Sequence, residues 1–171
     1  NGLIIGRDFM RNQEMFHCTI MRGGTSKAVF LKKNELPEDP NLLDKIILAI
    51  FGSPDVRQID GLGGSDITTS KVAIVGPPTR EDADIDYNFG QVQINSPEVI
   101  WNANCGNISS AVGPYAIDEG MVKVTEPITT VRIHNLGTGK ILVADVPVSN
   151  GRAVVEGDFS IDGVPGTGAM I

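Results

Sequence analysis

Residues 102–120 read NANCGNISSAVGPYAIDEG, and this stretch decides how the chain folds. Apolar residues recur after Asn107 at the spacing of one helix face: Ile108, Ala111, Val112, Tyr115 and Ala116. Gly120 follows where such a helix commonly ends. Pro114 lies inside the segment, so we expect a bend or a local irregularity there. The pattern predicts a helix that begins beside Cys105.

Strand patterns flank this helix on both sides. Residues 16–33 predict two strands joined at a glycine pair, residues 71–75 predict a third, and residues 85–94 alternate as in a half-exposed strand. Further strands are predicted at residues 129–136, 140–148 and 152–157. Many strands around few helices favour an α+β fold with a mixed or antiparallel sheet over a doubly wound fold.

A second helix is predicted between Asp39 and Gly52. Asp39 is its expected N-cap, Pro40 opens its first turn and Gly52 ends it. Its apolar stripe is expected to contain Leu42, Leu43, Ile46, Ile47 and Ile50.

Length and composition predict one globular, soluble domain. The chain has 171 residues, 41% of them apolar, and no apolar run of the roughly 20 residues that a membrane span requires. Its net charge of −7, with the 14 lysines and arginines scattered, argues against a nucleic-acid binder. We therefore expect neither a membrane nor a nucleic acid as partner.

The sequence also predicts features of the two ends of the chain. Charged residues interrupt residues 1–14, which argues against a signal peptide and favours a tag remnant or a disordered start. The glycine-rich residues 162–171, DGVPGTGAMI, are typical of a domain boundary. We expect residues 15–171 to form an N-terminal domain, with a second domain missing from this chain.

Cysteine and histidine usage gives no sign of a metal site. The two cysteines, Cys18 and Cys105, lie too far apart for a ligand motif or a disulfide framework, which favours a reducing cytoplasm. His17 precedes Cys18 and would point to the opposite face of a strand. We expect no metal, and we interpret Cys18 as a small core residue.

Two glycine-rich loops could indicate a nucleotide-binding site, but neither fits a nucleotide-binding motif. Residues 61–66, GLGGSD, end in an aspartate where a dinucleotide loop needs glycine, and residues 23–27, GGTSK, lack the first half of a P-loop. Both loops lead into Thr-Ser-Lys, at residues 25–27 and 69–71. Hydroxyls, an ammonium and free backbone N–H groups suit a carboxylate or another small anion. Two polar turns with exposed lysines are the alternative.

Cys105 is the stronger candidate for chemistry. A helix N-terminus carries unsatisfied N–H groups and partial positive charge, which favour a thiolate and can hold a substrate carboxylate. Gly106 would allow close approach of a ligand, and Asn107 and Ser109 would cap the helix or bind that ligand. Lys71 would be the second member of a proton-transfer pair. Simple packing of Cys105 remains the alternative.

Three long motifs resemble those of the PrpF-type isomerases, which include methylitaconate Δ-isomerase, 2-methylaconitate cis-trans isomerase and 4-oxalomesaconate tautomerase. They are MRGGTSKAVFL at 21–31, FGSPDVRQIDGLGGSDITTSKVAIVG at 51–76 and NCGNISSAVGPYAIDEG at 104–120. The resemblance implies a diaminopimelate epimerase-like fold, in which a curved, barrel-like sheet surrounds a central helix. It also implies two such domains, with the active site in the cleft between them.

The resemblance implies a function as well. It makes Cys105 and Lys71 the acid–base pair of a cofactor-independent isomerase of unsaturated di- or tricarboxylates. The substrate-binding residues that it implies are Arg22, Gly23, Gly24, Thr25, Ser26, Lys27, Ser65, Ser70, Gly106, Asn107 and Ser109. Methylitaconate is the preferred substrate and 2-methylaconitate the second. A fragment that only binds a carboxylate or a partner domain is the alternative, and a homo-oligomer stays open.

Overall fold

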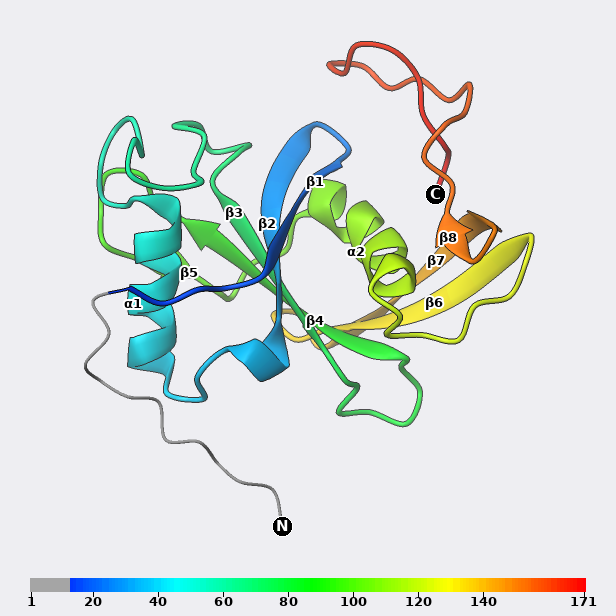
Figure 1. Ribbon diagram of the computed structural model, residues 1–171, viewed down its shortest axis with the longest axis horizontal. Coiled ribbons are helices and arrows are strands. Elements are labelled where there is room, and N and C mark those ends of the chain that lie inside the picture. Colours follow the sequence, from blue (N-terminus) through cyan, green and yellow to red (C-terminus); the bar gives the residue numbers. More distant parts are fainter. Residues whose placement is uncertain (1–12) are drawn as a thin grey trace.

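Two helices lie on opposite faces of one curved, eight-stranded mixed sheet, seen in the computed structural model in Figure 1. The structure describes residues 13–171. The predicted remnant or disordered start lies outside the described residues, apart from Gln13 and Glu14. No helix within residues 13–171 is long and apolar enough to cross a membrane.

The sheet runs in the order β1-β2-β3-β4-β6-β7-β8, and β5 pairs with β4. The strands are β1 (Cys18–Gly23), β2 (Ser26–Lys32), β3 (Lys71–Gly76), β4 (Ile85–Val92), β5 (Val99–Ile100), β6 (Ile128–Asn135), β7 (Lys140–Ser149) and β8 (Arg152–Ala153). The β2–β3 and β4–β6 pairs are parallel and the others are antiparallel. A curved, mixed sheet around a helix is the α+β architecture that the sequence predicted.

Helix α1 (Pro40–Phe51) has the predicted ends, because both are fixed locally. The Asp39 side chain accepts a hydrogen bond from the Asn41 N–H, and Gly52 adopts a left-handed conformation at φ 71°. Its buried face is rotated from the predicted stripe. Ile47 and Phe51 are buried, whereas Leu42 is 41% exposed.

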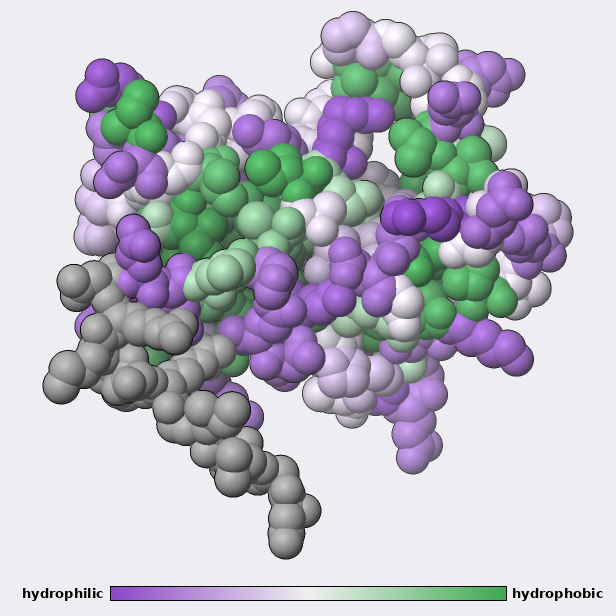
Figure 2. Space-filling model, viewed as in Figure 1, coloured by the Kyte–Doolittle hydropathy of each residue, from purple (hydrophilic) through white to green (hydrophobic). Residues whose placement is uncertain are grey.

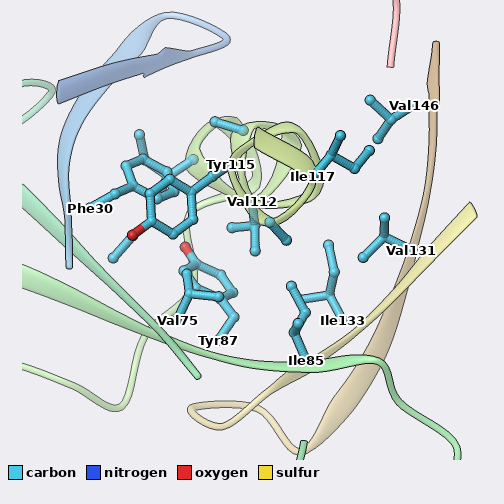
Figure 3. Close-up of a cluster of buried hydrophobic side chains, with 14 of the residues drawn as sticks. Phe30, Val75, Ile85, Tyr87, Val112, Tyr115, Ile117, Val131, Ile133 and Val146 are labelled. Atoms are coloured by element: carbon cyan, nitrogen blue, oxygen red, sulfur yellow. The ribbon is translucent and has the colours of Figure 1, made fainter. Parts of the chain in front are cut away.

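Helix α2 (Gly106–Asp118) is the central helix, and it continues through Pro114 without interruption. Its apolar face packs on the sheet in the cluster of Figure 3, where Phe30, Val75 and Val131 approach it from three strands. Full burial of one such side chain contributes about 1.5–3 kcal/mol. A 3-10 turn, η1 (Lys33–Glu35), follows β2.

Two sequence predictions about burial are wrong. Residues 85–94 were expected to be half-exposed, but β4 is buried on most positions because α1 and α2 cover its two faces. Cys18 was expected in the core, but it is exposed. Strand β1 lies at the edge of the sheet, and the alternation turns Met21 rather than Cys18 toward the core.

Candidate active site

Cys105 occupies the N-cap position of α2, in an extended conformation at φ −124° and ψ 107°. Its half-buried thiol donates a hydrogen bond to the hydroxyl of Ser26, with 3.9 Å between Sγ and Oγ. Ser26 opens β2 and is 3% exposed. The first turn of the central helix is therefore tied through its cysteine to the start of a core strand.

The predicted capping by Asn107 and Ser109 is wrong. No side chain caps α2. The Ser109 Oγ instead lies 2.9 Å from the Cys105 carbonyl oxygen and 3.1 Å from Asn104 Oδ1, and its one proton can be donated to either acceptor. The Asn107 amide donates to Thr25 Oγ1 at 2.9 Å. Because no side chain occupies the helix end, its first N–H groups remain available to a ligand.

The glycine pair of the β1–β2 turn packs directly on this helix end. A side chain at Gly23 would overlap the Asn107 carbonyl oxygen, and one at Gly24 would overlap the Asn107 amide. Gly24 also has φ +49°, which favours glycine. The turn and the helix start thus form one rigid unit, which positions Arg22, whose guanidinium donates to the Gly24 carbonyl oxygen at 2.8 Å.

A groove of about 380 Å³ opens beside this unit. Five of the predicted binding residues line it: Arg22, Gly23, Gly24, Gly106 and Asn107. The C-terminal segment, residues 154–171, forms the opposite side and contributes apolar residues such as Val155, Phe159 and Val164. Figure 2 shows green patches between pale and purple residues in that part of the molecule. At Gly106 an added Cβ would meet no described atom within 4 Å, so this helix residue faces open space.

Lys71 begins β3 and is buried, with 7% exposure. Its Nζ donates to Gln91 Oε1 at 2.6 Å and lies 5.3 Å from the centre of the Phe89 ring. Residues 73 and 75 of the same strand pack toward α2, so the alternation puts Lys71 on that face as well. Lys71 and Cys105 therefore occupy the same side of the sheet.

Ser26, the hydrogen-bond partner of Cys105, lies on the strand next to the one that Lys71 begins. It faces α2, as Ala28 does. Ala28 and Lys71 directly precede Val29 and Val72, which are partners in the parallel β2–β3 pair. The thiol, the Ser26 hydroxyl and the amine thus lie along one end of adjacent strands.

The second glycine-rich loop adjoins the first hairpin. The Lys27 N–H donates to the Thr68 carbonyl oxygen at 2.9 Å. Nearby, hydrogen bonds from the hydroxyl and the N–H of Thr68 lower the pKa of Asp66, and the charge of Lys71 lowers it further. Both Thr-Ser-Lys segments therefore contribute to one region.

Ser65 and Ser70 are not brought into the groove. Ser70 is fully buried, donates to the Val92 carbonyl oxygen at 2.9 Å and accepts from the Gln58 amide at 2.8 Å. Ser65 bonds to Gln58 Oε1 through its N–H and to the Arg57 carbonyl oxygen through its hydroxyl. Gln58, which is 1% exposed, is thus the centre of this loop.

Three polar residues near the site escaped the sequence analysis: Gln58, Tyr87 and Gln91. Burial raises the pKa of Tyr87 above its ordinary value, and negative charge at Cys105 raises it further, whereas nearby Ser109 opposes the shift. The Tyr87 hydroxyl is buried without a hydrogen bond of normal geometry. Only Gln91 could have been found in advance, as the residue opposite Lys71 on the neighbouring strand. That position follows only once the register of β3 and β4 is known.

The described part of the chain contains no group of three or more histidine, cysteine, aspartate or glutamate residues arranged to hold a metal ion.

Comparison with known proteins identifies the family of this chain. The family model described as PrpF protein matches residues 13–171. The chain belongs to the PrpF family. A curated PrpF relative, 3-methylitaconate isomerase of Eubacterium barkeri, is 61% identical over 160 residues, which cover 94% of this chain and 42% of the relative. The 4-oxalomesaconate tautomerase of Pseudomonas putida is 47% identical, covering 93% of this chain and 44% of the relative.

A solved structure gives the same fold. The crystal structure of methylitaconate-delta-isomerase superposes with a TM-score of 0.89 at 62% identity, covering 90% of this chain and 40% of that one. The PrpF chain described here spans less than half the length of the curated relatives it matches.

Proposed function

We propose that this chain forms the Cys–Lys side of the active site of a cofactor-independent isomerase of unsaturated di- or tricarboxylates. The observation that supports this most directly is the Cys105 thiol at the uncapped start of α2, on the same sheet face as buried Lys71. A thiol and an amine can take and return a proton without a cofactor.

The groove supplies donors for carboxylates. Uncapped N–H groups at Gly106 and Asn107 favour negative charge, and the Arg22 guanidinium lies at the same groove. One member of the pair would remove a proton from the carbon next to a carboxylate-stabilised double bond. The other would return a proton at the allylic carbon, so that the double bond moves and no atom is gained or lost. The donors would stabilise the negative charge that develops on the carboxylates.

Methylitaconate is the substrate we propose first, because the chain is 61% identical to a relative named for 3-methylitaconate. The second candidate is 2-methylaconitate. The distribution of donors supports either substrate, since both present carboxylates on a short unsaturated carbon chain.

The test uses the complete polypeptide with methylitaconate, 2-methylaconitate and aconitate in deuterated water. We expect isomerisation of methylitaconate with deuterium entering the product. Absence of both isomerisation and exchange for all three compounds would refute the enzyme and leave a carboxylate-binding or partner-binding fragment.

Variants test the two residues separately. We expect Cys105→Ser and Lys71→Ala each to lower kcat by orders of magnitude with an unchanged circular dichroism spectrum. Cys18→Ser and Lys45→Ala are the controls, because both side chains are exposed and lie outside the site. Near-normal turnover in either site variant would remove that residue from the mechanism.

A further inference from the structure

Gln91 is the hydrogen-bond partner of Lys71, and the backbone fixes its orientation. The two residues are directly opposite in the β3–β4 pair. Gln91 Nε2 donates to the carbonyl oxygens of Ser70 at 2.8 Å and Ile67 at 3.2 Å. Because carbonyl oxygens can only accept, the amide must turn its nitrogen toward them and its oxygen toward Lys71.

We propose that Gln91 is a positioning residue, which holds the Lys71 amine by a neutral hydrogen bond and so keeps it available for proton transfer. This inference rests on the proposed function, with Lys71 as the member of the pair that removes the proton from the substrate. Gln91 itself does not exchange a proton.

The surroundings of Lys71 explain why its hydrogen-bond partner has to be uncharged. The amine is buried against the Phe89 ring, and no carboxylate among residues 13–171 forms an ion pair with it. A glutamate at position 91 would place a negative charge at hydrogen-bond distance in a poorly solvated site, where the ammonium would be strongly favoured. An apolar side chain would leave the amine without its acceptor. Glutamine supplies the acceptor without the charge.

The elements around Lys71 carry four other titratable groups, of which Asp66 interacts with its charge. Asp66 lies in the loop before β3, Lys27 lies on β2, Tyr87 lies on β4 and Cys105 opens α2. None of the four forms a hydrogen bond to Lys71 Nζ. Gln91 is therefore the contact through which a single substitution changes the charge next to the amine.

The test replaces Gln91 by glutamate in the complete polypeptide and uses two independent measurements. One is the pH dependence of kcat/KM. The other is the pH dependence of Lys71 acetylation by acetic anhydride, followed by mass spectrometry, which needs no activity. We expect both midpoints to rise together by about 1–3 pH units. At neutral pH kcat/KM should fall tenfold or more and recover at higher pH.

Asn88→Asp is the matched control. It makes the same amide-to-carboxylate change on the same strand, but Asn88 is an odd number of residues from Gln91 and so points to the opposite face. We expect its midpoints to shift by less than about half a pH unit, because the sheet separates the new charge from Lys71.

Gln91→Met supplies a second test that does not depend on folding of the charged variant. We expect kcat to fall about tenfold with KM within twofold of the wild type, since the amine loses its position but the carboxylate donors remain. Unchanged midpoints in Gln91→Glu, or unchanged kcat in Gln91→Met, would overturn the inference. If the wild type isomerises none of the substrates, the proposed function fails, and the acetylation profile alone still decides whether Gln91 controls Lys71.

Discussion

Replacement of Gly106 by alanine would separate ligand binding at the start of α2 from folding. A Cβ at this position would meet no described atom within 4 Å, and the backbone is not left-handed there. Alanine at such a site stabilises a protein by about 0.4–1 kcal/mol, because it reduces the entropy of the unfolded chain. We therefore expect Gly106→Ala to fold at least as stably as the wild type.

The same substitution, Gly106→Ala, should lower kcat/KM. A methyl group at Gly106 would obstruct the approach of a substrate carboxylate to the helix end. Loss of one hydrogen bond to a charged group costs about 1.5–3 kcal/mol, which corresponds to roughly a 10- to 150-fold decrease in kcat/KM. Urea denaturation would give the stability and steady-state kinetics of the complete polypeptide would give kcat/KM.

Gly23→Ala is the contrasting variant. Its Cβ would lie 3.0 Å from Ile108 Cα and 3.1 Å from the Asn107 carbonyl carbon, and backbone atoms cannot move aside easily. We expect it to lose about 1–3 kcal/mol of stability from overpacking. A stable Gly106→Ala variant with kcat/KM within twofold of the wild type would refute ligand approach at this helix end. A Gly23→Ala variant of wild-type stability would refute the close packing.

Two further predictions concern buried polar groups. Burial raises the pKa of Tyr87 and Tyr115 above the ordinary value of 10, so above that pH the unfolded chain binds fewer protons than the folded one. Stability should fall by about 1.4 kcal/mol per tyrosine between pH 9 and pH 11, and an equally steep decline in a Tyr87→Phe, Tyr115→Phe double variant would contradict this cause. Asp86 is buried, and its Oδ1 lies 2.9 Å from His134 Nδ1. His134→Leu should cost about 1–3 kcal/mol in urea denaturation, with part of the loss recovered when Asp86→Asn is added.

Local signals account for the parts of the fold that the sequence predicted well. Asp39 marks a helix start through its side chain, and Gly52 and Gly120 mark helix ends through their left-handed backbone conformation. These features depend on a few neighbouring residues. The face on which Cys18 lies, and the burial of β4, depend instead on which elements cover the sheet. Periodicity does not contain that information.

The candidate site also contains some residues that the sequence could identify and others that it could not. Cys105 and Lys71 could be singled out because each follows a recognisable local pattern and matches a family motif. Gln91 lies 20 residues from Lys71 and meets it only through the register of β3 and β4. Ser70 matched a motif too, but its hydroxyl is used inside the protein. A motif identifies residue types, whereas burial and register decide what each side chain can reach.

The two parallel strand pairs affect the order in which the molecule folds. Residues 33–70 separate β2 from β3, and residues 93–127 separate β4 from β6, whereas short turns join β1 to β2 and β6 to β7. Closing a long loop costs chain entropy before its contacts form, so such pairs are slow to form. Lys71 begins the strand that the first closure brings beside β2, and Cys105 lies within the second loop. The site therefore comes together only in the least local steps of folding, and a chain arrested with its hairpins formed would have neither the thiol nor the amine in place.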